Sequence, residues 1–279
     1  MSLGPFDLTG GPFLQLYCAL FALTIVAGFL IPRWLRPEGR APRGPDVDAL
    51  AYLAGGTARF SDTVVARLLA ARRLAMVGRD KFAPDRNGAG GTAAERSVLA
   101  LSAPVGWPAI ARALSAHAKP IERRLIADGL MIDARTALQM RFFQTLPYLL
   151  LLGFGAIKWE VGTMRDRPVG FLTLLLIATA VFALIRWVAV DRKTRGGHRA
   201  LDEARAGAQR LRRGPPANEA DLGVALFGTA VLAGSGLSGF HQMRSTTSDG
   251  GSSGGDSGGG DGGGGCGGGG GGGCGGCGS

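Results

Sequence analysis

The chain has 279 residues, enough for one or two folded units, and combines 31 Lys and Arg residues with a positive mean hydropathy of +0.17. Charged and apolar residues occupy separate stretches, which argues against an ordinary soluble protein, because a charge at the centre of a bilayer costs about 2.5–3.5 kcal/mol on insertion scales. A net charge of +10 is also found in nucleic-acid-binding proteins, but here the basic residues crowd beside the apolar stretches, where they set topology and contact anionic lipid.

The first apolar stretch covers residues 13–31 and contains no charged residue. It is long enough to cross a hydrocarbon core of about 30 Å at about 1.5 Å per residue. A signal peptide has basic residues before its apolar core, whereas residues 1–12 carry only Asp7 and the arginines follow in the linker 32–45. The pattern predicts a retained membrane helix with a short extracytoplasmic N-terminus.

Residues 46–136 have the composition of a soluble module, because charged residues recur throughout this stretch. Asp46 or Asp48 can cap a first short helix that stops at Gly55-Gly56, and Ser61 can cap a second. Three more short helices are predicted after a glycine-rich loop, over residues 95–101, 108–117 and 120–128. A basic helix followed by a turn and a short apolar strand occurs twice, near Leu74 and near Leu130. This order favours a small helical module that resembles one or two winged-helix units.

Two further apolar stretches, 142–159 and 169–190, predict a second and a third membrane helix. The connection 160–168 is short, so the two helices should be antiparallel neighbours. Arg186 lies near the end of the third helix, where its side chain can reach the interface.

The orientation follows from the basic segments of the chain. Basic residues outnumber acidic residues in 32–141 and in the segment 191–221. The positive-inside rule therefore predicts that both face the cytoplasm. The N-terminus and the loop 160–168 should face outward.

The stretch 222–240 has no charged residue, but it contains several glycines and fewer large apolar residues than the other apolar stretches. It is compatible with a fourth membrane helix, and equally with an interfacial helix or a helix packed on the rest of the protein. The sequence therefore predicts a mainly α-helical membrane protein with three or four membrane helices.

Residues 249–279 form a tail of Gly, Ser and Asp that also contains Cys266, Cys274 and Cys277. No apolar side chain offsets a backbone entropy of about 1–2 kcal/mol per residue, so the tail is predicted to be disordered. The three cysteines are candidate zinc ligands, although a tetrahedral site needs a fourth ligand. The simpler interpretation is a low-complexity tail with accessible thiols. Cys18, within the first membrane helix, is predicted to be inert.

Four short motifs and the tail follow one another in a characteristic order. The motifs are YLAGG (52–56), RPVGFL (167–172), RKTRGG (192–197) and VALFG (224–228). Their order, together with the CGGCG-type ending, resembles a family of uncharacterised bacterial integral membrane proteins with an N-terminal anchor, a helical hairpin and a Gly/Cys-rich tail. The resemblance covers most of the chain and implies this architecture and a multi-pass location in the bacterial inner (plasma) membrane. It implies no activity, catalytic residue or ligand.

The sequence contains no recognisable catalytic constellation, so we do not expect an enzyme. His117, His198 and His241 are far apart and lack HxxxH or HExxH spacing, and no nucleophile-elbow or phosphate-loop motif precedes a predicted helix. The predicted membrane helices contain no acidic residue, which argues against proton-coupled transport.

Non-enzymatic functions remain. A membrane-tethered winged-helix regulator would present Lys119, Arg123 and Arg124 to nucleic-acid phosphates, but Glu122 on the same helix favours an ordinary solvated surface. Nucleic acid is therefore not an expected partner. The tail offers a third role, as a metal-binding or thiol-sensing segment. The sequence favours a scaffold that binds a protein partner through 46–136 and carries a flexible, thiol-bearing tail.

Overall fold

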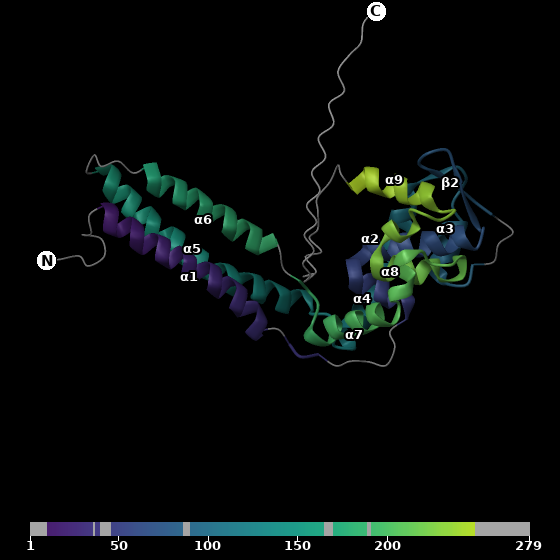
Figure 1. Ribbon diagram of the computed structural model, residues 1–279, viewed down its shortest axis with the longest axis horizontal. Helices are drawn as coiled ribbons and strands as arrows, with labels where there is room; N and C mark the ends of the chain where they lie inside the picture. The colour runs from purple at the N-terminus through teal and green to yellow at the C-terminus, as the bar shows by residue number, and fades with distance from the viewer. Residues whose placement is uncertain are drawn as a thin grey trace, which may run out of the picture.

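The computed structural model describes residues 10–35, 37–39, 46–85, 90–164, 170–188 and 191–248. Within these ranges three long helices form an elongated bundle, and the shorter elements form a separate module at one end of it (Figure 1). The bundle comprises α1 (Gly10–Leu35), α5 (Ala134–Met164) and α6 (Gly170–Val188). The module comprises α2 (Val47–Ala70), β1 (Leu74–Val77), β2 (Lys81–Pro84), α3 (Ala93–Leu99), β3 (Val105–Gly106), α4 (Trp107–Ala127), α7 (Arg195–Gly207), η2 (Gln209–Arg213), η3 (Ala217–Glu219), α8 (Ala220–Phe227), η4 (Thr229–Leu232) and α9 (Ser238–Ser248).

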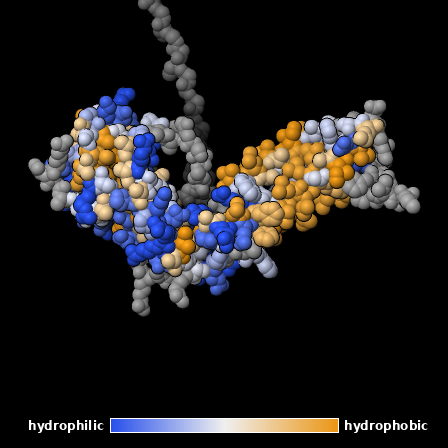
Figure 2. Space-filling view, turned by 180° about the vertical axis from the view of Figure 1, so that it is seen from behind, coloured by the Kyte–Doolittle hydropathy of each residue, from blue (hydrophilic) through white to orange (hydrophobic). Residues whose placement is uncertain are grey.

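The bundle helices expose many of their large apolar side chains, although Phe13, Leu151 and Leu172 form a small buried cluster between them. Leu23, Leu150 and Leu174 are 62%, 67% and 65% exposed, one on each helix. Figure 2 shows a continuous hydrophobic surface along the bundle and a mainly hydrophilic surface on the module. A surface of this kind is stable in lipid, where the apolar side chains have no water to avoid. The structure confirms three helices that are long and apolar enough to span a membrane.

Polar contacts hold the bundle together from within. α5 packs against both α1 and α6, which contact each other less. The hydroxyl groups of Tyr17 on α1 and Thr179 on α6 are 3.2 Å apart and buried. At the module end, Arg186 donates a hydrogen bond to the carbonyl of Gly28 and lies 5.2 Å from the ring centre of Phe29. The arginine that was predicted to reach the interface therefore also joins α6 to α1.

The core of the module is built from two parts of the chain, one before α5 and one after α6. We call α5 and α6 together the membrane hairpin. One apolar cluster joins Phe60 and Leu68 of α2 with Leu114 of α4, Val224 of α8 and Phe240 of α9. α2 lies at its centre, between α4 and α8. Because a helix with an apolar face must bury that face against another element, α2 requires partners from both parts of the chain.

The segment 191–221, expected as a separate basic stretch, is part of this module, because Leu201 of α7 and Leu211 of η2 are buried in its core. The module is therefore larger than the predicted 46–136. Of the alternatives for 222–240, the packed one is correct. This segment forms α8, η4 and the start of α9, so the prediction of a fourth membrane helix is wrong for this part of the chain.

α4 is one long helix where the sequence predicted two, whereas α2 is interrupted at Gly55 and Gly56, where the sequence predicted the end of a short helix. α2 continues through a kink at Gly55 and Gly56, and Ser61, the predicted N-cap, is buried within the helix. Gly56 has φ +65°, which other residues rarely adopt, so the chain can kink here without a loop. α4 continues through Pro120, and the carbonyl that this proline leaves without a helical donor belongs to the exposed Ala116.

A small antiparallel sheet covers one end of the module. β1 pairs with β2 in a hairpin that places Leu74 opposite Pro84, and β3 pairs with β2 through Phe82 and Val105. The hairpin lies between α2 and α3 in the chain. The module is mainly helical, as predicted, but of the two expected helix–turn–strand repeats the first ends in strand β1, whereas near Leu130 the chain forms an isolated bridge at Met131.

The two chain segments that connect the membrane hairpin to the module are bonded to each other. Met131, before α5, and Lys193, after α6, form an antiparallel bridge. Beside it, Arg192 forms a 2.7 Å ion pair with Glu122 of α4, which also accepts a hydrogen bond from Tyr52 of α2 at 3.0 Å. These contacts fix the module at the end of the hairpin.

Candidate anion-binding pocket

The sequence predicts three cysteines as candidate metal ligands. Cys266, Cys274 and Cys277 lie outside the described residues. Among the residues that the structure describes, no group of three His, Cys, Asp or Glu side chains could hold a metal ion. Cys18, predicted to be inert, is exposed on the outer surface of α1.

The histidines each have a local polar contact. His198 Nε2 lies 2.7 Å from Asp191 Oδ2, next to the connection between bundle and module. His241 Nδ1 lies 3.3 Å from the hydroxyl of Thr229. His117 lies on α4. They occupy three different parts of the module and do not form a catalytic or metal-binding set.

The basic face of α4 is an exposed surface without a cavity. Lys119 and Arg123 are exposed, and Arg124 pairs with Asp128 of the same helix at 3.9 Å. Glu122 on this helix is engaged by Arg192, at the junction with the bundle. This mixture of charges is that of a solvated face and adds nothing in favour of nucleic-acid binding.

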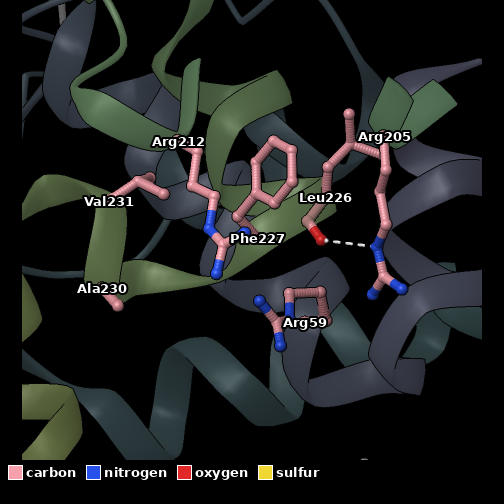
Figure 3. A pocket seen from close by; sticks show the side chains of 7 residues that line it. All are labelled: Arg59, Arg205, Arg212, Leu226, Phe227, Ala230 and Val231. Atoms are coloured by element: carbon pink, nitrogen blue, oxygen red, sulfur yellow. Dashed lines mark hydrogen bonds between the residues drawn. The ribbon is translucent and has the colours of Figure 1, made fainter. Parts of the chain in front are cut away.

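A cavity of about 370 Å³ opens elsewhere, among α2, α7, α8, η2 and η4 (Figure 3). Three arginines and four apolar residues line it: Arg59, Arg205, Arg212, Leu226, Phe227, Ala230 and Val231. We call it the arginine pocket. Its arginines come from α2, α7 and η2, so no local sequence pattern unites them, and the sequence analysis did not identify any of the three as a site residue.

Arg59 is positioned by two glycine-containing segments. It follows the kink of α2, and its Nη1 donates a hydrogen bond to the carbonyl of Val224 at 3.3 Å. Gly228 ends α8 with φ +88°, and a Cβ atom at this position would overlap the guanidinium of Arg59. Only glycine therefore allows α8 to end in this way against Arg59.

The other two arginines come from α7 and η2. Arg205 Nε donates a hydrogen bond to the carbonyl of Leu226 at 3.2 Å. Arg212 is exposed and follows Leu211, whose side chain is buried in the core and holds η2 in place. Figure 3 shows the guanidinium groups of Arg59 and Arg212 directed toward the same space beside Phe227.

Carboxylates on the surrounding elements form ion pairs with arginines outside the pocket. These pairs are Asp62 with Arg244 at 2.7 Å, Asp221 with Arg67 at 2.8 Å, and Glu219 with Arg210 at 2.8 Å. Burial raises the pKa of Asp62, while Arg244 and then Arg59 act in the opposite direction. No acidic residue is among those that line the cavity, although Asp62 of α2 interacts electrostatically with Arg59.

A second group of charges near α2 has a structural role. Arg67 contacts Asp48 at 2.6 Å, Asp221 at 2.8 Å and Glu95 at 3.3 Å. Burial alone lowers the pKa of Arg67, but these carboxylates raise it above its usual value, so the group stays charged. The three carboxylates surround a guanidinium and link α2 to α3 and α8, which leaves no room for a metal ion among them.

The lining of the arginine pocket is suited to binding and not to proton transfer or nucleophilic attack. Arginine stays protonated in proteins, and its planar fork of N–H donors matches carboxylate and phosphate groups. The other lining side chains are apolar and carry no ionisable or nucleophilic group: Leu226, Phe227, Ala230 and Val231.

Two of the sequence motifs contribute directly to this geometry. YLAGG provides the kink that precedes Arg59, and VALFG provides the Leu226–Phe227 wall and the Gly228 end of α8. A third, RKTRGG, spans the start of the helix that carries Arg205.

No protein-family model, curated protein or solved structure matches the chain. The family resemblance drawn from the motifs therefore stays a prediction.

Proposed function

We propose that this protein is a non-enzymatic binding protein of the bacterial inner membrane, whose cytoplasmic module holds an anionic partner in the arginine pocket. The observation that carries the proposal is the convergence of Arg59, Arg205 and Arg212 on one cavity with apolar walls. A guanidinium group donates several N–H groups in one plane, which suits an anion with more than one oxygen atom.

The membrane placement rests on the bundle and its flanking charges. α1 ends, α5 begins and α6 ends at the module side of the bundle, as Figure 1 shows. The basic segments 32–141 and 191–221 are on this side, which supports a cytoplasmic module under the positive-inside rule. The bonded connection between Met131 and Lys193 would keep a bound partner at a constant position relative to the membrane.

The partner must carry a group with several negatively charged oxygen atoms. A protein partner, which the sequence favours, can supply it through a carboxylate or a phosphorylated side chain. Nucleic acid is a weaker candidate, because the exposed face of α4 that carries Lys119 and Arg123 also carries acidic residues.

The proposal is tested with sulfate as a minimal anion. Full-length protein in phosphatidylcholine nanodiscs is unfolded thermally in sodium sulfate and in sodium chloride of equal ionic strength. Sulfate stabilises folded proteins in general, and a bound anion adds RT ln(1 + [L]/Kd), about 1.4 kcal/mol at ten times its Kd. We expect Arg212→Met to lose this added part.

Arg213→Met is the matched control, since Arg213 is exposed on the same turn and does not line the cavity. It should retain the full effect of sulfate on Tm. Equal sulfate effects in wild type, Arg212→Met and Arg213→Met would show that the pocket takes no anion, and the proposed function would fail.

A further inference from the structure

Two arginines lie within the bundle helices at the end of the bundle that meets the module. Arg141 is near the start of α5, and Arg186 is near the end of α6. Gln144 donates a hydrogen bond from Nε2 to the carbonyl of Arg186. Arg141 is three residues before Gln144, and residues at this spacing are neighbours on the helix surface. Both arginines therefore lie where α5 packs against the end of α6.

Two exposed tryptophans indicate that this end of the bundle lies at the level of the lipid headgroups. Trp187 follows Arg186 directly, and Trp34 is near the end of α1. Tryptophan is enriched at the boundary between hydrocarbon and headgroups. Figure 2 shows the hydrophobic surface of the bundle meeting a hydrophilic surface at this end. At this level a guanidinium group can reach lipid phosphate groups.

The bundle helices supply no counter-charge for these arginines. Glu160 is the single acidic residue in the sequences of α1, α5 and α6, and it lies about 28 Å from Arg141 along the helix, at 1.5 Å per residue. Among the described residues, no carboxylate forms an ion pair with either arginine, and the Nε groups of both are buried without an acceptor. Arg186 contacts the carbonyl of Gly28 and the ring of Phe29, which carry no net charge.

The nearest carboxylates, on the segments that flank the membrane hairpin, have other partners. Asp133, just before α5, accepts a hydrogen bond from the N–H of Thr136 at 3.3 Å. Asp191, just after α6, lies 2.7 Å from His198 Nε2. Charged groups at the edge of the hydrocarbon are costly without a partner, so an anionic group from the surrounding lipid would stabilise this end of the bundle.

We infer that the module end of the bundle binds an anionic phospholipid through Arg141 and Arg186. This surface is separate from the arginine pocket, and the inference does not depend on the ligand of that pocket. The lipid phosphate offers oxygen acceptors to the N–H donors of a guanidinium group. Phosphatidylcholine also has this phosphate, but its headgroup carries a cation of its own. Two arginines without a protein counter-charge therefore favour a lipid with a net negative charge, such as phosphatidylglycerol.

Native mass spectrometry of the full-length protein in detergent tests the inference, because it resolves the binding of individual lipids. The protein is titrated with phosphatidylglycerol and, separately, with phosphatidylcholine of the same acyl chains. We expect the first phosphatidylglycerol to bind at least about fivefold more tightly, the factor that one Lys or Arg near an anionic headgroup contributes. Arg141→Gln should reduce this preference about fivefold, and Arg141→Lys, which keeps the charge, should retain most of it.

Arg135→Gln is the matched control, since it removes the same charge from an exposed position of α5 nearer to the module. It should retain the full preference. Equal affinities for the two lipids in the wild type would overturn the inference, as would an unchanged preference in Arg141→Gln. Equal losses in Arg135→Gln and Arg141→Gln would attribute the preference to net charge and reject the site. A loss in Arg141→Lys as large as in Arg141→Gln would assign Arg141 a packing role and reject it as well.

Discussion

The bundle exposes many of its large apolar side chains, whereas the module buries its own in one core. In the bundle, Leu174 is 65% exposed while the hydroxyls of Tyr17 and Thr179 meet in the interior. In the module, Leu68 is 1% exposed, and charged groups such as Arg67 lie between elements or at the surface. Burial of apolar surface from water can therefore drive the folding of the module but not the association of the bundle helices, which depends on packing and internal hydrogen bonds.

Two stretches without charged residues, 13–31 and 222–240, show the same difference between bundle and module. Residues 13–31 form one uninterrupted helix with an exposed apolar surface, whereas 222–240 is divided by Gly228 and folds back onto α2. The absence of charge is common to both. What differs is whether the backbone can continue as one helix and whether a complementary apolar surface exists in the module.

The largest expected effect is an all-or-none difference in thiol labelling. Starting from a variant with Ser at all four natural cysteine positions, Ser238→Cys places a thiol on an exposed residue of α9, and Leu174→Cys places one on the exposed face of α6. In inside-out vesicles, a membrane-impermeant maleimide should label Ser238→Cys fully and Leu174→Cys not at all. Protection of Ser238→Cys would place 222–240 in lipid and contradict the packed arrangement.

Ion pairs of the module should contribute most to the free energy of unfolding where they are partly buried. Arg67→Met leaves Asp48, Glu95 and Asp221 without their shared counter-charge, and we expect a loss of about 3–5 kcal/mol in the free energy of unfolding. Urea unfolding of the protein in nanodiscs, followed by circular dichroism, measures this loss.

Arg124→Met is the control for this prediction, because the pair of Arg124 with Asp128 is solvent-exposed and should contribute less than about 1 kcal/mol. Similar losses in the two variants would mean that the cluster around Arg67 is no more important than a surface pair.

A matched pair of leucine truncations compares a buried leucine of the module with an exposed leucine of the bundle. Leu68→Ala creates a cavity in the module core and should cost about 3 kcal/mol. Leu174→Ala removes the same atoms from an exposed surface, where lipid fills the space, and should change stability by about 0.5 kcal/mol or less. The same urea unfolding experiment compares them. A larger loss for Leu174→Ala would indicate that this face of α6 packs against protein.

The smallest effect concerns the pH dependence of the module. Burial raises the pKa of Glu95, but hydrogen bonds from the Gly91 N–H and from Arg67 outweigh it and hold the pKa below the usual value. A carboxylate whose pKa is lower in the folded state stabilises folding above its unfolded pKa, about 4.3, and this contribution is lost as the pH falls through the lower folded value.

Between neutral pH and about pH 3, the Tm of the wild type should therefore fall more than that of Glu95→Gln. Differential scanning calorimetry in nanodiscs measures both curves. Parallel curves would show that Glu95 does not contribute to acid sensitivity.

The membrane helices were predictable because their placement depends on the composition of one continuous stretch. The predicted 13–31 and the observed apolar span Gly11–Ile31 differ by two residues at one end. Within the module, by contrast, local signals were misleading. Pro120 indicated a helix boundary but lies inside α4, and Ser61 indicated an N-cap but is buried in α2, because packing against neighbouring helices outweighs these local preferences.

By itself, the sequence determined the helical class, the three apolar helices and the mostly helical nature of the module, because each depends on residues that are neighbours in the chain. Only the tertiary structure decided that 191–221 and 222–240 complete the module and that Arg59, Arg205 and Arg212 share one cavity. The physical reason is that the burial of α2 requires α8 as a partner, and this pairing brings Arg59 next to residues more than a hundred positions later in the chain.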